Sequence, residues 1–250
     1  MLCIASEYSD PYLNLASEEY LLKERSEDFF LLYRNAPCIV IGKHQNAMAE
    51  VNHAFIRERQ IRVARRISGG GAVYHDPGNL NFTFITTGEE GKLVDYGRYT
   101  LPIIEAMGTL GLKVSVGKRN ELLLGTKKIS GTACHVFKHR VLHHGTLLFS
   151  SDLETLENAL RAGEGPREDR AVRSVRSEVT NISDHLPDEM DILDFQDRIL
   201  DYILRTMAGA VPYRYNREDL KRIHVLRDSK FSTREWNFGY NPGYRFSRKG

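Results

Sequence analysis

The chain has 250 residues, of which 41% are hydrophobic and 27% are charged, and its formal net charge is +2. This composition provides enough apolar material for a real core, and so small a net charge argues against a nucleic-acid partner. Three widely separated cysteines argue against a disulfide framework and against a cysteine zinc site. The sequence has no apolar run long enough to span a membrane, so we predict no membrane partner. It shows no signal or transit peptide, which predicts a cytoplasmic protein.

The first part of the chain predicts two helices and a pair of strands. Asp10 followed by Pro11 is typical of a helix start, and this helix should end near residue 23. Two short apolar runs, 29–33 and 38–41, lie on either side of an Asn-Ala-Pro sequence and are expected to pair with each other. Asn52 is expected to cap a helix that ends near residue 60.

The remainder of the chain mixes runs of strands with isolated helices. We predict a strand at 80–86, a helix at about 99–110, several short strands between 114 and 149, a helix opened by the capping-box spacing of Ser151 and Glu154, and a helix from 192 to 207. Strands that come in runs favour an α+β fold with mixed or mostly antiparallel sheets and flanking helices. No repeat or linker divides the sequence, so we predict one domain over residues 1–250.

Residues 65–79 are the most informative part of the sequence. Gly69, Gly70 and Gly71 lack Cβ atoms, so a ligand can lie against the backbone, and successive N–H groups can converge on an anion. Arg65 and Arg66 just before them can bind phosphate or carboxylate through paired hydrogen bonds. The alternative is a glycine-rich hairpin without a ligand, and the glycines alone do not decide between the two. The familiar P-loop and dinucleotide-binding patterns are absent.

The glycine cluster is the first of six blocks that follow one another along the chain. Residues 66–79 read Arg-x-Ser-Gly-Gly-Gly-Ala-Val-Tyr-His-Asp-x-Gly-Asn, and the other blocks lie at 119–122, 128–133, 143–148, 174–182 and 236–239. In composition and order they resemble the lipoate–protein ligase A family, and the resemblance covers essentially the whole chain. It implies an α+β catalytic domain similar to those of biotin protein ligases and class II aminoacyl-tRNA synthetases.

The resemblance implies a ligase that attaches lipoate to proteins in two steps. ATP first activates the lipoate carboxylate as lipoyl-AMP, with release of pyrophosphate and with Mg²⁺ at the phosphates. A lysine amine on a lipoyl domain of a 2-oxoacid dehydrogenase, or on the glycine-cleavage carrier protein, then attacks the mixed anhydride. This chemistry requires mainly that two anions be positioned and that charge at phosphorus be stabilised.

The resemblance also implies roles for individual residues. Lys128 is the expected catalytic residue, contacting both the lipoyl carbonyl and the phosphate, while Lys127 beside it is expected to be solvated. Arg66 is expected to bind phosphate. The nucleotide is expected to lie along Gly71, Ala72, Val73 and Tyr74, and the lipoyl or anhydride end is expected near Ser68, Gly70 and His75.

Other polar residues of the blocks have less specific expected roles. Asn120 and Glu121 are expected to help hold Mg²⁺, although the family more usually has Asp where Glu121 stands. Asn79 is expected to brace its turn, and His144 to order its loop rather than to transfer a proton. Four arginines of a long loop are expected to close over the adenylate or to meet an acidic acceptor, with a merely solvated loop as the equal alternative for the first two. They are Arg167, Arg170, Arg173 and Arg176.

The chain departs from the family pattern near its end. Family members often carry a small C-terminal accessory domain, whereas this sequence ends at Gly250, eleven residues past Gly239. We therefore expect that the accessory domain is absent, either because the chain is truncated or because it is a short form that works with a separately encoded small subunit. Some short forms need that subunit for adenylation.

Two other functions remain open. One is lipoyl or octanoyl transfer without adenylation, which in this superfamily runs through a cysteine thioester. Cys134 directly follows the lysine block, but we expect it to be a packing residue. The other is a lipoyl-adenylate-binding module that needs a partner subunit. Biotin ligation is disfavoured, because the GRGRxGR-type loop of biotin ligases is absent.

Overall fold

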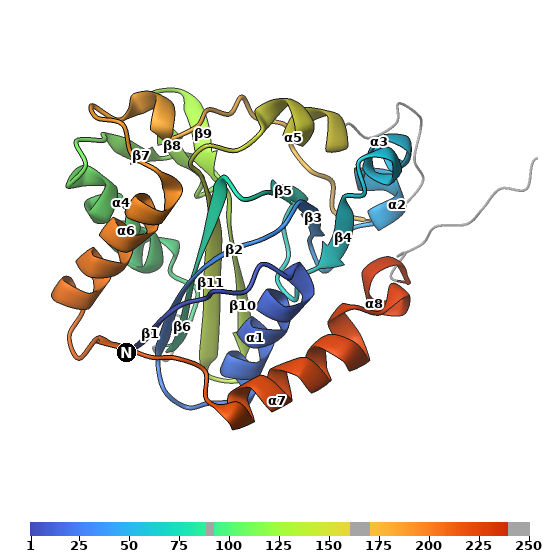
Figure 1. Cartoon of the computed structure of the whole chain (residues 1–250), viewed down its shortest axis with the longest axis horizontal. Helices are drawn as coiled ribbons and strands as arrows, with labels where there is room; N and C mark the ends of the chain where they lie inside the picture. Colours follow the sequence, from blue (N-terminus) through green and yellow to red (C-terminus); the bar gives the residue numbers. More distant parts are fainter. Residues whose placement is uncertain (89–92, 161–170, 240–250) are drawn as a thin grey trace, which may run out of the picture.

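A six-stranded mixed sheet forms the centre of the molecule (Figure 1). The computed structural model describes residues 1–88, 93–160 and 171–239. In spatial order the strands are β10 (Thr132–Phe137), β11 (Arg140–Leu148), β6 (Asn79–Thr87), β2 (Phe29–Arg34), β1 (Leu2–Ala5) and β12 (Val211–Pro212). The pairings from β10 to β2 are antiparallel, whereas β1 is parallel to both of its neighbours. The predicted α+β fold with mixed sheets is confirmed.

Two smaller sheets flank one end of the central sheet. One has the order β4 (Arg62–Arg65), β3 (Cys38–Ile41), β5 (Val73–His75), and the other has the order β7 (Val114–Val116), β8 (Leu122–Leu124), β9 (Lys127–Ser130). The expected pairing of 29–33 with 38–41 is therefore wrong. Residues 29–33 are buried throughout, because β2 is a central strand with β1 and β6 on its two sides. The Asn-Ala-Pro link carries the chain from one sheet to the other.

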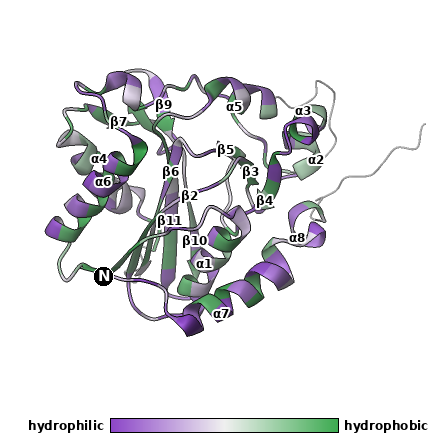
Figure 2. Ribbon diagram, in the orientation of Figure 1, coloured by the Kyte–Doolittle hydropathy of each residue, from purple (hydrophilic) through white to green (hydrophobic). Residues whose placement is uncertain are grey.

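The two faces of the central sheet are covered by different helices (Figure 1). α4 (Tyr96–Gly108) and α6 (Ile192–Thr206) pack on one face, and α1 (Pro11–Glu24) and α7 (Arg217–Leu226) pack on the other. Alternation along β2 accounts for this division, since Phe30 and Leu32 enter the first core while Phe29 and Leu31 enter the second. In Figure 2 the hydrophobic colour is concentrated on the strands between these helices.

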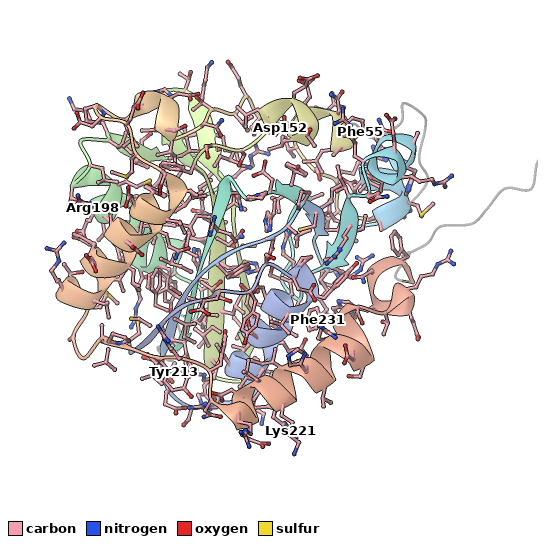
Figure 3. The ribbon with its side chains drawn as sticks, in the orientation of Figure 1. Phe55, Asp152, Arg198, Tyr213, Lys221 and Phe231 are labelled. Carbon is pink, nitrogen blue, oxygen red and sulfur yellow. The ribbon has the colours of Figure 1, made fainter. Side chains whose placement is uncertain are left out.

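Shorter helices complete the structure. α2 (Ala47–Glu50), α3 (His53–Glu58) and α5 (Leu153–Ala159) surround the β4-β3-β5 sheet, and α8 (Arg234–Phe238) packs against β4. A 3₁₀ turn, η1 (Ser183–His185), precedes α6, and a π-helical turn, η2 (Arg227–Phe231), follows α7. Figure 3 shows Arg198 and Lys221 on the outer sides of α6 and α7, as expected for amphipathic helices whose charged side chains face water. Within the described residues, no helix is both long enough and apolar enough to cross a membrane.

The helix starts follow local side-chain chemistry closely. Asp10 caps α1 by accepting a hydrogen bond from the Tyr12 N–H at 3.0 Å, and Asn52 caps α3, as predicted. The prediction for Ser151 is one residue out. Asp152 is the cap of α5, because its carboxylate accepts from both the N–H and the hydroxyl of Thr155.

Candidate active site

A cavity of about 300 Å³ opens on the face of the central sheet that α1 covers. Its walls come from the glycine cluster, the β8–β10 segment, the His144 block and residues 172–175. Of the residues predicted from the sequence, Arg66, Gly70, Gly71, Ala72, Val73, His75, Glu121 and Lys128 line it. Ser68, Tyr74 and Asn120 are not among its lining residues. Segments far apart in the sequence thus converge on one site.

One row of the central sheet forms the floor of the cavity. Thr146 pairs with Asn81, and Asn81 pairs with Tyr33, so these three side chains lie across neighbouring strands. Gly131 continues the row, since it exchanges two hydrogen bonds with Thr146, both at 3.1 Å. Ordinary strand pairing therefore places Gly131 and Tyr33 at opposite ends of the row.

Arg66 braces the glycine loop from beneath. Its guanidinium donates to Ser68 Oγ at 3.0 Å and to the carbonyl oxygens of Val40, Gly69 and Gly71 at 2.7–3.0 Å. Four of its five N–H groups are therefore engaged inside the protein. Burial lowers the pKa of Arg66 to about 10, so the group remains a cation at neutral pH. In this structure Arg66 shapes the loop and places a positive charge beside the loop backbone.

Two glycine positions in this region are required by geometry. Gly70 has φ +93°, a conformation that residues with a Cβ rarely adopt. Gly42 lies so close to the loop that a Cβ there would overlap the carbonyl oxygen of Gly70. The glycine loop therefore lies directly against the end of β3.

Arg65 does not take part in the cavity. Its side chain is buried and donates to the carbonyl oxygens of Trp236 and Asn237 in α8, as well as to the loop after β3. In return, Trp236 Nε1 donates to the Arg65 carbonyl oxygen at 2.8 Å. The expectation that both arginines bind an anion is therefore wrong for Arg65, because its guanidinium is taken up by backbone carbonyl oxygens inside the protein. The Trp-Asn-Phe-Gly block instead clasps Arg65.

Behind the glycine loop lies a buried hydrogen-bonded chain. Ser68 Oγ is 2.6 Å from His144 Nε2, and His144 Nδ1 is 3.0 Å from both oxygens of Glu18. Burial raises the pKa of Glu18, but the charge and hydrogen bond of His144, with hydrogen bonds from Thr83 and Tyr33, lower it further, so its net shift is downward. The carboxylate is thus the buried negative charge near Arg66, and the chain links α1 to the loop.

Lys128 projects into the cavity from β9. Its Nζ lies 3.2 Å from the position that a Cβ of Gly131 would occupy. Burial and the positive charges of Arg119 and Arg66 lower its pKa, while the Glu121 carboxylate opposes that shift. Within the part of the chain that the structure describes, the ammonium has no hydrogen-bond or ion-pair partner. Lys127, by contrast, is exposed and pairs with Glu178 at 3.0 Å.

Glu121 supplies a carboxylate at the outer part of the cavity. One of its oxygens accepts the Arg119 N–H at 2.7 Å. Burial raises its pKa, but the backbone N–H groups and the charges of Arg119 and Lys128 lower it by more, so the group stays ionised. Among the described residues no group of three His, Cys, Asp or Glu side chains is arranged to hold a metal ion. A single carboxylate together with substrate phosphates is nevertheless a common Mg²⁺ ligand set, so Glu121 fits the expected ion.

The segment 172–175 lies across the glycine loop. Ser174 Oγ accepts hydrogen bonds from the Ala72 N–H at 2.9 Å and from Gln45 Nε2 at 3.1 Å, and its own N–H donates to Glu50. Arg173 lines the cavity, whereas Arg176 is exposed and is not among the lining residues. Arg167 and Arg170 lie outside the described residues.

Cys134 faces away from the cavity. Its neighbour Ala133 lines the site, and alternation along β10 directs Cys134 to the other face of the sheet, opposite His143 of β11. There, burial and a hydrogen bond with Cys134 raise the pKa of Tyr96 to about 12. The thiol is therefore placed for packing, and not for attack on a substrate in this cavity.

Several lining residues received no role from the sequence. They include Leu15, Tyr33, Val40, Asn81, Arg119 and Thr146. Arg119 and Thr146 stand inside the recognised blocks, so the blocks themselves were the available signal. Leu15 lies on α1, and Tyr33, Val40 and Asn81 lie on strands, where nothing in the local sequence separates a cavity wall from the core.

Comparisons with known proteins agree on one family. The model of the lipoyl protein ligase A/B catalytic domain matches residues 10–204. Lipoate–protein ligase 1 of Staphylococcus aureus is 42% identical over 246 residues, which cover 96% of this chain and 74% of that protein. The chain thus spans about three quarters of that relative.

Solved structures give the same result. Protein Ta0514 of T. acidophilum with bound lipoic acid has a TM-score of 0.83 at 25% identity, covering 95% of this chain and 99% of that one. A lipoate-protein ligase A bound with ATP has a TM-score of 0.82 at 25% identity, with coverage of 96% and 98%. A bi-partite lipoate protein ligase from Thermoplasma acidophilum, described with its E2 lipoyl domain, has a TM-score of 0.81 at 25% identity, with coverage of 96% of each chain.

Proposed function

The chain belongs to the lipoyl protein ligase A/B catalytic domain family and is a ligase, and on this basis we propose that it uses ATP to attach lipoate to a specific lysine of lipoyl-domain proteins through lipoyl-AMP. One observation carries the proposal. The Lys128 ammonium lies at a cavity that is walled on one side by the glycine loop and to which Leu15 and Val40 contribute apolar side chains. The relatives with bound lipoic acid and bound ATP support both substrates.

In the first step a carboxylate oxygen of lipoate attacks the α-phosphorus of ATP. A new oxygen–phosphorus bond forms, the bond to the oxygen bridging to the β-phosphate breaks, and pyrophosphate leaves with that electron pair. Lys128 offsets the repulsion between the two anions, and Arg66 adds positive charge beneath the loop. The nucleotide lies along the backbone from Gly71 to Tyr74. The side chain of Tyr74 does not contact it, because that side chain packs into the apolar cluster behind β5.

In the second step the acceptor amine attacks the carbonyl carbon of the anhydride. A carbon–nitrogen bond forms, the bond from that carbon to the phosphate oxygen breaks, AMP leaves, and the nitrogen loses one proton. Lys128 polarises the carbonyl in this step. Ser68 and Gly70 hold the loop at the acyl end, and His75 lies beside the lipoyl chain. Glu121, with the phosphates, is the residue that would hold Mg²⁺, which supplies charge neutralisation at phosphorus.

The partners follow from the same proposal. The acceptors are lipoyl domains of 2-oxoacid dehydrogenases, the glycine-cleavage carrier protein, or both, and the T. acidophilum ligase described with its E2 lipoyl domain supports the first class. Residues 1–250 act as one catalytic domain, and a separate small subunit takes part where the chain alone does not adenylate. We place the reaction in the cytoplasm, where the three free cysteines remain reduced.

The test is lipoate-dependent exchange of labelled pyrophosphate into ATP by the purified chain, with Lys128→Ala beside it. Exchange that disappears in the variant supports adenylation by this chain. If the intact protein shows no exchange, preformed lipoyl-AMP and a lipoyl domain are supplied. Transfer under those conditions identifies a transferase that needs a partner for adenylation, and no transfer identifies a binding module.

Cys134→Ser separates ligation from thioester transfer. Ligation through lipoyl-AMP leaves the rate of the variant near that of the parent, because the thiol lies on the far face of β10. Octanoyl transfer from acyl carrier protein that is lost in Cys134→Ser, with a thioester trapped on the parent, would establish the transferase function instead.

A further inference from the structure

His75 carries an unused hydrogen-bond donor at the inner part of the cavity. The residue is 4% exposed and lines the cavity. Its Nδ1 is 3.0 Å from Asn35 Nδ2, whereas its Nε2 is buried and has no partner among the described residues. Buried polar groups in proteins are almost always paired, so an unpaired nitrogen on a side chain that lines a cavity indicates a ligand contact.

The protonation state of this ring is set by a chain of amides. Asn14 Nδ2 donates to the carbonyl oxygen of Tyr8 and to Asn35 Oδ1, both at 2.8 Å. Because the Tyr8 carbonyl oxygen can only accept, the Asn14 side-chain atom that bonds to it is the amide nitrogen. The same nitrogen also donates to Asn35, so the Asn35 atom that accepts this bond is its side-chain oxygen. The Asn35 nitrogen therefore donates to His75 Nδ1, and the single ring proton resides on Nε2. Burial, with the charges of Arg66 and His144, lowers the pKa of His75 to about 3, so the ring stays neutral.

His75 lies at the end of the cavity away from Lys128. Val73 is next to Gly131 and the Lys128 ammonium, and His75 is two residues further along β5, or about 7 Å. Asn35, which holds the His75 ring, follows directly after β2, and β2 is separated from β10 by two strands. A ligand with its carboxyl group at Lys128 therefore extends its tail toward His75.

The surroundings of the His75 donor are otherwise apolar or already paired. Leu15, Val40 and Val73 supply apolar walls. The polar lining side chains in this part are engaged inside the protein: Tyr33 and His144 with Glu18, Asn81 with the Tyr33 carbonyl, and Thr146 with Gly131. Among the described residues of the inner cavity, the Nε2–H of His75 is thus the directional group left for a ligand.

We propose that His75 determines which acid is used, by donating its Nε2–H to a sulfur atom of the dithiolane ring and thereby favouring lipoate over acids with purely hydrocarbon tails. The inference rests on the proposed lipoate ligase function. A ring sulfur is a weak acceptor, but a hydrocarbon tail offers none and leaves the buried N–H unsatisfied. A site with a fixed polar group rejects an analogue that lacks its partner more strongly than a purely apolar pocket does.

The probe that isolates this contact is 5-cyclopentylpentanoic acid, which keeps the chain and ring of lipoic acid but replaces both sulfurs by carbon. Kd for the two acids is measured by calorimetry without ATP, and kcat/KM by pyrophosphate exchange. We expect the parent to prefer lipoate by about tenfold, equivalent to about 1.4 kcal/mol. His75→Leu, which removes the donor, should reduce that preference to about twofold or less, and His75→Gln, which retains an N–H, should restore part of it.

Val40→Ala is the matched control. It enlarges the apolar wall without touching a polar group, so both acids should lose affinity together and their ratio should persist. ¹⁵N NMR of the imidazole adds a direct readout. We expect the proton on Nε2 in the free protein and a shift of its resonance with lipoate that is absent with the cyclopentyl acid.

The outcomes separate the inference from the proposed function. Equal ratios in the parent and in His75→Leu, or a ring proton on Nδ1, overturn the role of His75 even if pyrophosphate exchange is intact. A lipoate preference in calorimetry that His75→Leu removes, in a chain that shows neither pyrophosphate exchange nor transfer from preformed lipoyl-AMP, leaves the inference standing and contradicts the proposed function. A His75→Leu variant that weakens both acids equally places the His75 contact on the carboxyl group and overturns the proposal.

Discussion

The ammonium of Lys128 lies over the α-carbon of Gly131. A Cβ at position 131 would come within 3.2 Å of Nζ and 3.4 Å of Cε, closer than ordinary van der Waals contact. The glycine backbone cannot yield easily, because its N–H and carbonyl oxygen both bond to Thr146. The end of the Lys128 side chain is flexible, so a methyl group added at position 131 displaces the ammonium and leaves the strand in place.

Gly131→Ala should therefore reduce adenylation without unfolding the protein. We expect pyrophosphate exchange to fall about tenfold, because a displaced ammonium no longer fits the charge that forms at phosphorus. The free energy of unfolding in urea should change by no more than about 0.5 kcal/mol. Combining the change with Lys128→Ala should add no further loss of rate, since the glycine acts through the lysine. An additional loss in the double variant contradicts this reasoning.

Replacement of Lys128 itself should have the larger effect. Lys128→Met keeps the length of the side chain and removes the charge, and we expect kcat to fall by about two orders of magnitude, or about 3 kcal/mol in the transition state. KM for lipoate should change much less, because the apolar wall remains. Lys127→Met is the control, since its exposed ion pair with Glu178 contributes little. Similar losses in both variants argue against a specific role for Lys128.

The parts of the site predicted from the sequence are those whose chemistry is local. The glycine run follows from its residue types, and Lys128 follows from the resemblance of its block to the ligase family; the structure brings both to one cavity. Tyr74 shows the limit of this approach. It stands in the same block, yet strand alternation directs its side chain into the β4-β3-β5 core between the cavity-facing Val73 and His75.

Other features depend on contacts that no local pattern contains. Residues 29–33 and 38–41 looked like a hairpin, but their partners come from residues 2–5, 79–87, 62–65 and 73–75. Likewise, the chain from Tyr8 through Asn14 and Asn35 to His75 joins four segments. Each asparagine alone reads as a turn or surface residue, so the donor that they create becomes visible only in three dimensions.

The clasp around Arg65 predicts a purely structural effect near the end of the described chain. Asn237 is buried, accepts the Arg65 N–H at 2.8 Å and donates to the carbonyl oxygens of Phe231 and Thr233. Asn237→Ala leaves these groups unpaired, and we expect a loss of about 2 kcal/mol and a Tm roughly 4–8 °C lower. Scanning calorimetry measures this shift.

The exposed Arg234 on the same helix is the control for this clasp. Arg234→Ala should change the free energy of unfolding by less than about 0.5 kcal/mol. Below its melting range, Asn237→Ala should retain the KM of the parent for lipoate and for ATP, because the clasp lies on the side of β4 away from the cavity. A change in either KM with an unchanged Tm would show that the clasp shapes the site.

His143 makes the last prediction, on the pH dependence of stability. It is 1% exposed, stacks on Tyr99 at 5.3 Å between ring centroids, and has no partner for Nε2 among the described residues. Burial, with a smaller effect of His144, lowers its pKa from 6.5 to about 3. Below pH 6.5 His143 therefore binds a proton in the unfolded chain but not in the folded protein, and the free energy of unfolding falls as the pH decreases toward 3.

His143→Phe removes this proton and keeps the ring stacking. Between pH 7 and pH 5 the parent should lose about 2 kcal/mol more free energy of unfolding than the variant does, because about 1.5 pH units of the titration fall in that interval. Urea unfolding at the two pH values measures the difference, and the other histidines cancel because both proteins contain them. Parallel losses in parent and variant would mean that His143 takes up its proton in the folded state, which requires an acceptor or water at Nε2.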